Sequence, residues 1–203
     1  TFPVNWCPRC ETAIADAEVE HQPQQGEIHT IKFQLENGDH IKIATTRPEL
    51  LSSCVAIAVH PDDNRYKQYV GKKVKVPTTN RTVKIITDEL VDPKFGTGIV
   101  MICTYGDKAD VKCVKKRKLP IIMSINEEGK MTENAGKYAN LTLQEAKKAI
   151  VEGLKQQGLL EKTEPIQQEV GQCWRCHTPI EILERKQWFM KTRQLTPLVE
   201  KTA

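Results

Sequence analysis

Two matched cysteine pairs, one near each end of the chain, constrain the fold more than any other feature of the sequence. Cys7 and Cys10 lie in the segment Trp-Cys-Pro-Arg-Cys, and Cys173 and Cys176 lie in Cys-Trp-Arg-Cys. A Cys-x-x-Cys turn lets two thiolates reach one metal ion, so each pair supplies half of a tetrahedral zinc site. The pairs therefore predict a zinc ribbon made from both chain ends, with the intervening residues inserted between its halves.

Other interpretations of the cysteines are less favoured. A single pair would leave a redox dithiol as a competitor, but two similar pairs favour zinc. His177 follows Cys176 directly and could replace a thiolate, although four sulfurs suffice. Because a closed four-thiolate site has no open position, we expect the ion to stabilise the fold and not to catalyse. Cys54, Cys103 and Cys113 stand singly in apolar surroundings.

The totals place the chain among globular proteins. With 203 residues, 39% of them hydrophobic and 28% charged, it can form one core and a small satellite domain. No apolar run is long enough to span a bilayer and no signal peptide precedes the first motif, so we expect a cytoplasmic protein without a membrane partner. The net charge of +4 permits a nucleic-acid partner without demonstrating one. Because the sequence opens on Thr1, we expect an excised fragment of a longer chain.

Alternating apolar and polar residues predict that the inserted domain begins as β-structure. Residues 28–33 and 40–43 alternate on either side of Asn37 and Gly38, and Asn-Gly between such runs is a strong hairpin signal. Apolar runs predict further strands over residues 53–59, 74–77, 83–86, 99–103, 121–125 and, around Trp188, 180–190.

Two segments are predicted to be helical. The first covers residues 107–118, and the second covers residues 141–157, where Thr142 and Glu145 have the spacing of a capping box. The apolar face of the second helix consists of Leu143, Ala146, Ile150 and Leu154.

The stretch from residue 95 to residue 110 contains the first candidate site. Gly96 and Gly98 favour a turn, residues 99–103 follow as a buried strand, and Asp107 and Asp110 stand where that strand ends. If Asp107 caps the following helix, both carboxylates can face the same opening at the end of the strand and bind a cation. The helix dipole alone also favours Asp at these positions, so the local pattern leaves a structural and a functional role open.

A second polar group stands at the end of the strand that closes the hairpin. Thr45, Thr46 and Arg47 precede Pro48 and Glu49, and Pro48 ends the strand. In one interpretation the threonines are strand formers and Arg47 is a surface charge. In the other they bind a polar ligand, with Arg47 taking a phosphate or a carboxylate.

Taken together, the motifs resemble the editing insertion, or connective peptide, of class I aminoacyl-tRNA synthetases, most closely the valyl enzymes of archaeal type. They occur in the order Thr45-Thr46-Arg47-Pro48-Glu49, His60-Pro61-Asp62-Asp63, Phe95-Gly96-Thr97-Gly98 and Gly106-Asp107-Lys108-Ala109-Asp110. Isoleucyl enzymes are similar in Gly-Thr-Gly and the later Asp but usually carry Trp after the threonine motif. Neither His-Ile-Gly-His nor Lys-Met-Ser-Lys-Ser is present, so we expect no aminoacyl-adenylate synthesis from this chain.

The resemblance implies a β-rich fold of mixed α and β class. It would be a distorted, closed, six-stranded β-barrel with peripheral helices, together with the zinc ribbon made from both chain ends. The implied boundaries are residues 1–20 for the first half of the ribbon, 21–165 for the editing barrel, and 166–203 for the second half and a link to the synthetic domain.

The resemblance also implies post-transfer editing, in which the ester between a wrong amino acid and the 3′-terminal adenosine of tRNA is hydrolysed. For a valyl enzyme the wrong amino acid is threonine, because a hydrophobic pocket cannot strongly reject an isostere that adds only a hydroxyl. The implied partners are tRNA and the remainder of the synthetase. Zn²⁺ would be structural, and the editing chemistry itself would need no cofactor.

By position in the motifs, Asp110 resembles the carboxylate that binds the substrate ammonium, and Asp107 a second acidic group near the amino acid's polar end. The implied catalytic residues are Asp110, Asp107, Thr45 and Thr46. The implied substrate-binding residues are Arg47, Pro48, Glu49, Phe95, Gly96, Thr97, Gly98, Met101, Cys103 and Thr104. The implied metal ligands are Cys7, Cys10, Cys173 and Cys176.

Two positions depart from the bacterial valyl pattern. Met101 stands where those enzymes carry Lys, and Cys103 where they carry Thr, so Thr104 or Asp107 would have to recognise the threonine hydroxyl. No residue resembles an obligatory general base, and we expect an oriented water to attack. The alternatives are an isoleucyl-type domain that clears Val-tRNA(Ile), a non-catalytic zinc-ribbon RNA-binding module, and a cysteine hydrolase using Cys103, which has no His in a motif with it.

Overall fold

The computed structural model describes residues 1–188, 190–192 and 196. The strands are β1 (Phe2–Cys7), β2 (Thr12–Ile14), β3 (Val19–Leu35), β4 (His40–Thr45), β5 (Cys54–Val59), β6 (Lys73–Lys75), β7 (Thr82–Thr87), β8 (Ile99–Cys103), β9 (Leu160–Cys173) and β10 (Glu181–Arg185). The helices are α1 (Lys108–Arg117), α2 (Leu143–Gln156) and the 3-10 helices η1 (Asp16–Glu18), η2 (Pro48–Ser53), η3 (Lys67–Tyr69) and η4 (Glu133–Tyr138). Most of the expected link over residues 191–203 lies outside the described residues.

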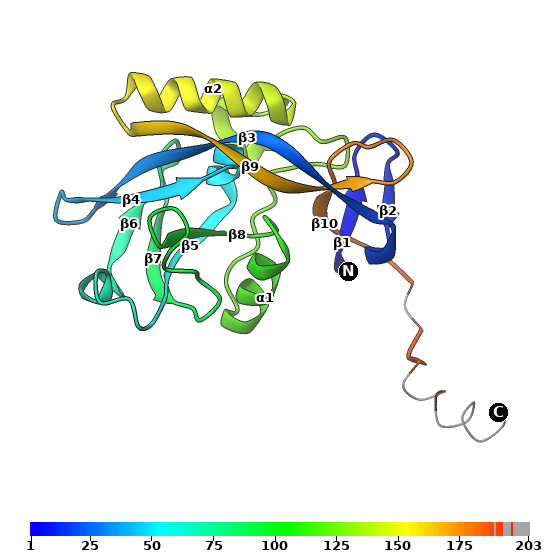
Figure 1. Ribbon diagram of the computed structural model, residues 1–203, viewed down its shortest axis with the longest axis horizontal. Helices are drawn as coiled ribbons and strands as arrows, with labels where there is room; N and C mark the ends of the chain where they lie inside the picture. Colours follow the sequence, from blue (N-terminus) through cyan, green and yellow to red (C-terminus); the bar gives the residue numbers. More distant parts are fainter. Residues whose placement is uncertain (189, 193–195, 197–203) are drawn as a thin grey trace.

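Six strands form the expected barrel, in the order β4-β3-β6-β7-β5-β8, with β9 paired to β3 outside this path. Neighbouring strands are antiparallel except β5 and β7, which are parallel. Strands β4 and β8 contact each other, although in the described part of the chain they are not a hydrogen-bonded pair, so the barrel is nearly closed with one seam. Helices α1 and α2 lie outside it, on opposite sides (Figure 1). The predicted β-rich barrel with peripheral helices is confirmed.

The barrel core follows from the alternation in the hairpin strands. Ile31 and Phe33 of β3 and Ile43 of β4 are fully buried, because every second residue of a strand points to the same face. The hairpin turn at Asn37 and Gly38 is present, with Gly38 at φ +89°. The barrel therefore forms where the sequence alternates, as expected.

Both helices begin at the predicted caps. Asp107 is the N-cap of α1, and Thr142 is the N-cap of α2 with a complete capping box to Glu145. Ala146, Ile150 and Leu154 are buried on the inner face of α2, so the predicted amphipathic helix packs against the barrel as the spacing requires.

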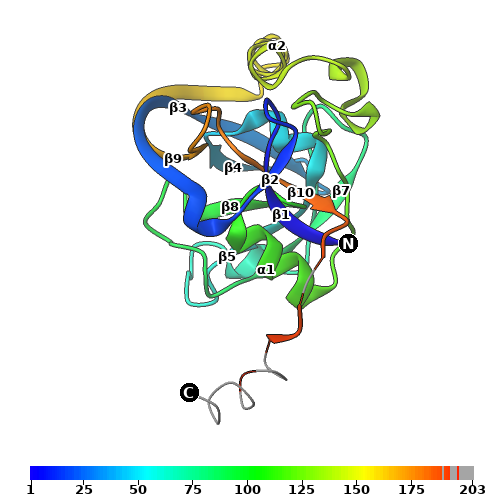
Figure 2. The ribbon, with the colours of Figure 1, turned by 90° about the vertical axis from the view of Figure 1, so that its right-hand side faces the viewer.

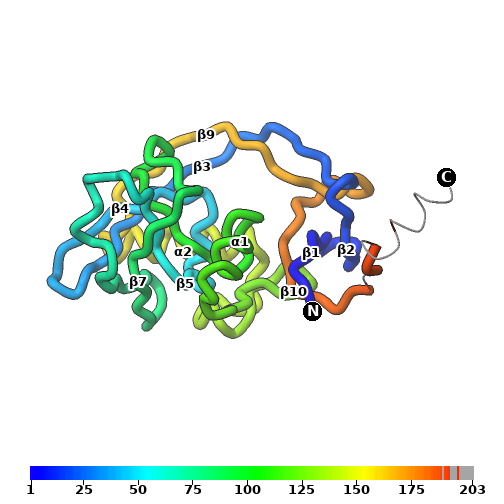
Figure 3. The backbone as a smooth tube through the Cα atoms, turned by 90° about the horizontal axis from the view of Figure 1, so that it is seen from below, coloured from blue at the N-terminus to red at the C-terminus, as the bar shows by residue number. Residues whose placement is uncertain are grey.

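Two long strands connect the barrel to a small second sheet. Strand β3 pairs with β9 from Val19↔Cys173 to Ile31↔Leu160 and extends beyond the barrel to the cysteine end (Figure 3). There β10, β1 and β2 form a three-stranded sheet with its own core of Cys7, Ile14 and Cys173. The two segments that carry the cysteine pairs thus meet, as the pairs predicted, and Figure 2 shows this sheet in front of the barrel.

Two expected strands differ from the structure: residues 121–125 are not a strand, and the strand expected over residues 180–190 is only Glu181–Arg185 and does not include Trp188. Residues 121–125 form no strand in the described structure; Ile125 alone makes an isolated bridge to Met131. The backbone of this run bonds to side chains instead: Ile122 N–H donates to the Thr104 hydroxyl, and the Met123 carbonyl accepts from Thr132 and Asn134. None of the helices in the described part of the chain is both long enough and apolar enough to cross a membrane.

Candidate functional site

A cleft of about 1140 Å³ runs between the barrel and the small sheet and continues beneath the long β3/β9 pair. The end of β4, the start of α1 and strand β8 form its barrel side. Of the residues implied by the resemblance, those that line the cleft are Thr45, Thr46, Arg47, Glu49, Phe95, Met101, Cys103, Asp107 and Asp110. The fold therefore brings the threonine-arginine loop and the two aspartates to one recess, although Asp107 follows Thr46 by 61 positions in the chain.

The two aspartates differ in their exposure and in the backbone groups that they bind. Asp107 is exposed, and its Oδ1 accepts the Asp110 N–H at 2.7 Å, which caps α1. Asp110 is only 9% exposed, and its Oδ2 accepts the Cys103 N–H at 3.2 Å, so it reaches back from the helix to the last residue of β8. A Cβ at Gly106 would collide with that same Oδ2, which explains the glycine in the turn before the helix.

The surroundings of Asp110 favour its neutral form. Burial, and after it the nearby Asp107 charge, raise the pKa of this carboxyl to about 8, although the Cys103 N–H and Arg47 act in the opposite direction. In the absence of a ligand the group is therefore largely protonated at neutral pH. A cation placed beside it would favour the ionised form, so the site is suited to receiving an ammonium group.

Arg47 connects three parts of the site. Its Nε donates to Glu49 Oε1 at 2.9 Å, its Nη2 to Glu181 Oε2 at 2.7 Å, and its Nη1 to the Gly106 carbonyl at 3.5 Å. The Arg47 N–H also donates to Thr45 Oγ1 at 3.0 Å, which holds the threonine-arginine loop in shape. The anions nearest to Arg47 are thus two internal carboxylates, and any external anion would have to share the guanidinium with them.

Cys103, the last residue of β8, and Thr104, which follows the strand, lie on different sides of it. Cys103 lines the cleft, and burial raises the pKa of its thiol well above the ordinary value, so it is uncharged and poorly suited to attack as a thiolate. Thr104 is 1% exposed and lies outside the cleft lining. Its hydroxyl donates to the Ser53 carbonyl at 3.4 Å and accepts the Ile122 N–H at 2.8 Å, so it is engaged on the far side of the strand.

Four further implied residues lie near the cleft residues in the chain but outside the cleft lining. Gly96 and Gly98 adopt φ of +57° and +80° and form the expected turn, and the Thr97 carbonyl accepts the Tyr66 hydroxyl at 2.7 Å. Pro48 begins the buried 3-10 helix η2. None of these four implied residues is part of the cleft lining.

Two cleft residues were not found from the sequence. Lys147 of α2 donates to the Thr46 carbonyl at 3.0 Å, and nothing in a lysine beside an apolar helix face indicates this. Glu181 of β10 is 5% exposed and holds Arg47. The sequence contains a weak signal for Glu181, because it lies two residues before the buried Leu183 and therefore on the same face of the strand. A carboxylate on the buried face of a strand needs a cation.

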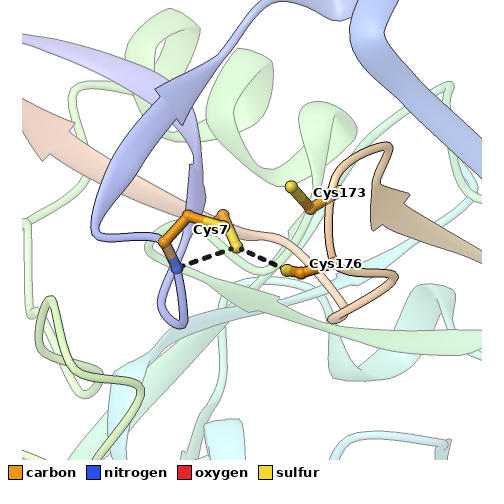
Figure 4. Close-up of side chains that lie close together, drawn as sticks. Cys7, Cys173 and Cys176 are labelled. Carbon is orange, nitrogen blue, oxygen red and sulfur yellow. Dashed lines mark hydrogen bonds between the residues drawn. The ribbon is translucent and has the colours of Figure 1, made fainter.

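The four paired cysteines form a second candidate site, at the end of the small sheet. Their sulfur atoms all lie within 4.8 Å of one another, and Cys7 Sγ is 3.4 Å from Cys176 Sγ (Figure 4). Tetrahedral zinc with Zn–S bonds of about 2.3 Å places its sulfurs about 3.8 Å apart, so this donor set fits zinc. Hydrogen bonds from Thr178 lower the pKa of Cys176 to about 6, which favours a thiolate there. His177 points its ring towards Glu20, at 3.5 Å, and is mostly exposed.

The barrel with its peripheral helices, and the cleft shared by the two motif regions, have the arrangement that the resemblance to the editing insertion of class I aminoacyl-tRNA synthetases implies. A LeuRS from Agrobacterium radiobacter K84, solved in a ternary complex described as LeuRS-tRNA-LeuAMS, matches with a TM-score of 0.53 and 18% identity. The match covers 77% of this chain and 24% of that one, and it concerns the fold alone. No protein-family model matches the chain.

The sequence comparison is more specific. Valine–tRNA ligases from Methanopyrus kandleri and Methanocaldococcus jannaschii are 57% and 54% identical over 99% and 100% of this chain. The ligase from Methanothermobacter thermautotrophicus is 54% identical over 99% of it. This chain is therefore a relative of one segment of the archaeal valine–tRNA ligases, which confirms the predicted resemblance. It spans 23% of the length of each of these relatives.

Proposed function

We propose that this chain is the editing domain of a cytoplasmic valine–tRNA ligase and hydrolyses the ester that joins threonine to the valine tRNA. The observation that carries the proposal is the shared cleft: the Thr45-Thr46-Arg47 loop and Asp110 open on the same recess. The high identity to valine–tRNA ligases supports the choice of that enzyme. The remainder of the ligase and the tRNA are the proposed partners.

In this proposal Asp110 receives the ammonium of the misattached amino acid. The carboxyl is oriented by the Cys103 N–H and is raised in pKa, so an incoming ammonium displaces its proton and leaves a buried ion pair. That pair would fix the amino acid end of the substrate at the end of β8. The 3′-terminal adenosine would then lie along the Thr45-Thr46-Arg47 loop, across the cleft.

The side-chain hydroxyl of threonine needs a polar partner that valine does not. Met101 and the uncharged Cys103 thiol offer little, and Thr104 is engaged on the other side of β8. Asp107 is exposed on the cleft and uses Oδ1 for the helix cap, so we assign the threonine hydroxyl to its Oδ2.

The ester carbonyl would lie between these two ends, close to the N-terminus of α1. Backbone N–H groups at a helix N-terminus carry a partial positive charge, which stabilises the oxyanion that forms when water attacks. The substrate's ammonium and ribose hydroxyls orient that water. Hydrolysis then returns free threonine and uncharged tRNA. Cys7, Cys10, Cys173 and Cys176 would hold a zinc ion whose contribution is to stabilise the small sheet.

The test is an Asp110→Ala substitution in the full-length ligase, scored by accumulation of threonine on the valine tRNA. We expect accumulation, with valine charging little affected. Asp16→Ala is the matched control, because Asp16 is an acidic residue on the cleft rim with a 75% exposed side chain. Threonine levels equal to those of the unchanged enzyme would contradict the proposal.

Two further measurements separate the alternatives. Faster hydrolysis of Val-tRNA(Ile) than of Thr-tRNA(Val) would indicate the isoleucyl-type domain instead. Binding of tRNA without loss of either ester would indicate a non-catalytic RNA-binding module.

A further inference from the structure

We propose that Glu181 is a positioning residue for the editing cleft, and that through Arg47 it makes the geometry of the cleft depend on metal binding by the cysteine ribbon. The proposal concerns how the site is held together, and its link to catalysis rests on the proposed function. Glu181 itself does not have to touch the substrate.

The guanidinium of Arg47 is the point where the parts meet. Each of its three nitrogens contacts a different element: Nε reaches Glu49 of η2, Nη1 reaches the Gly106 carbonyl before α1, and Nη2 reaches Glu181 of β10. The Gly106 turn leads directly to Asp107 and Asp110. A shift of the guanidinium would therefore move the threonine-arginine loop relative to the aspartates.

Glu181 belongs to the ribbon and not to the barrel. It is the first residue of β10 and lies opposite Trp6 in the pairing of β10 with β1. The next residue of β1 is Cys7, a proposed metal ligand, and β10 follows the Cys-x-x-Cys turn that contains Cys176. The position of the Glu181 carboxylate is thus set by the strands that the four cysteines hold together.

Burial distinguishes this contact from the other ion pairs that join the ribbon to the barrel. The Glu181 side chain is 5% exposed, and its partner Arg47 is 31% exposed. The pair Lys108–Asp16 also joins the two parts at 2.9 Å, but its side chains are 64% and 75% exposed, so solvent screens it. Loss of the Arg47 contact would leave the buried Glu181 carboxylate without a compensating charge, which is costly.

The coupling also has a physical direction. When the ribbon loses its metal, the end of β1 and the turn at Cys176 that leads to β10 lose the thiolate centre that holds them together, and Glu181 becomes free to move. Arg47 then keeps Glu49, only two residues away in the chain, and the long 3.5 Å contact to the Gly106 carbonyl, which alone holds the loop against α1 less firmly. The expected result is a looser Gly106 turn and a misplaced Asp110.

The experiment compares Glu181→Gln with Glu127→Gln. Glu127 is the matched control, because it forms an ion pair with Arg185 of the same strand β10 from the barrel side, away from the cleft. In the full-length ligase we expect Glu181→Gln to lower kcat/KM for Thr-tRNA hydrolysis about tenfold, the loss of one charge-assisted hydrogen bond, and Glu127→Gln to change it less than twofold.

The second readout does not depend on activity. Hydrogen exchange of residues 44–49 and 103–111 is measured with stoichiometric zinc and after chelation, relative to core strand β5. With zinc bound, Glu181→Gln should already exchange faster in both segments. In the unchanged protein and in Glu127→Gln, chelation should make hydrogen exchange faster in both segments. In Glu181→Gln, chelation should change the exchange rate of these segments little. If the glutamine variant does not fold, Glu181→Asp, which keeps the charge but shortens the reach, takes its place with the same expectations.

Equal exchange in Glu181→Gln and the unchanged protein with zinc bound would overturn the proposal. An equal response of all variants to chelation would do the same, since the ribbon would then act by another route. If the unchanged enzyme does not hydrolyse Thr-tRNA, the proposed function fails, but the exchange measurements still decide whether Glu181 couples the ribbon to the cleft.

Discussion

The protonation of Asp110 gives the sharpest quantitative test of the site. Its pKa is near 3.8 in an unfolded chain and is raised to about 8 in the folded protein, chiefly by burial and then by Asp107. Between these values the folded protein holds a proton that the unfolded chain has lost. Stability must therefore fall as pH rises through this window, and the group favours folding fully only below about pH 4.

The size of the effect follows from the linkage relation. One proton held only by the folded state changes the free energy of unfolding by about 1.4 kcal/mol per pH unit. Asp110→Asn keeps the shape and the acceptor for the Cys103 N–H but cannot ionise. Relative to the unchanged protein, the variant should therefore gain about 3 kcal/mol between pH 5 and pH 7, or roughly 5–10 °C in melting temperature for a chain of this size.

The assay is thermal unfolding of both proteins at pH 5, 6 and 7, at constant ionic strength and with zinc present. Asp16→Asn serves as the control, because hydrogen bonds from Lys108 and Asn5 lower the pKa of Asp16. That carboxylate is ionised in both states throughout this range, so its variant should show a difference independent of pH. If the difference between Asp110→Asn and the unchanged protein were also independent of pH, Asp110 would be ionised in the empty cleft and the reasoning about its environment would be wrong.

Two other outcomes test the same geometry. Gly106→Ala should lower both the stability and the rate of Thr-tRNA hydrolysis, because the added Cβ collides with Asp110 Oδ2. A destabilisation of about 1–3 kcal/mol is expected in thermal melts. An unchanged melting temperature would mean that this turn is looser than the structure shows. Chelation or Cys10→Ser should lower the melting temperature of the small sheet and release one zinc per chain, which a colorimetric indicator detects. Cys113→Ser changes a cysteine outside the cluster and should leave the amount of bound zinc unchanged.

Local chemistry explains what the sequence could predict. Asn37-Gly38, the caps at Asp107 and Thr142 and the two cysteine pairs each carry their own geometric requirement, and each appears where expected. The threonine-arginine loop and the aspartates were placed in one site by resemblance, and the fold brings both to the same cleft.

The features that sequence reasoning missed depend on long-range pairing. Strand β9 and the first half of β3 are polar on both faces, because this two-stranded segment stands away from the barrel, so no apolar alternation marks them. The Arg47–Glu181 pair depends on the register of β10 against β1, which no local pattern encodes. Residues 121–125 have the apolar content of a strand, but their backbone groups are satisfied by Thr104, Thr132 and Asn134.

The charges around the cleft suggest why a protonated amine is the fitting ligand. Arg47 and Lys147 are the cations close to the threonine-arginine loop, and the buried Glu49 and Glu181 balance them. An ionised Asp110 would then be a buried, excess negative charge beside Asp107, so burial and, after it, the Asp107 charge keep it protonated. A substrate ammonium supplies the missing positive charge and releases that proton. A neutral or anionic ligand does not favour release of the Asp110 proton. In the proposed site the charge balance therefore selects an aminoacyl ester with a free amine over a tRNA end that carries no amino acid.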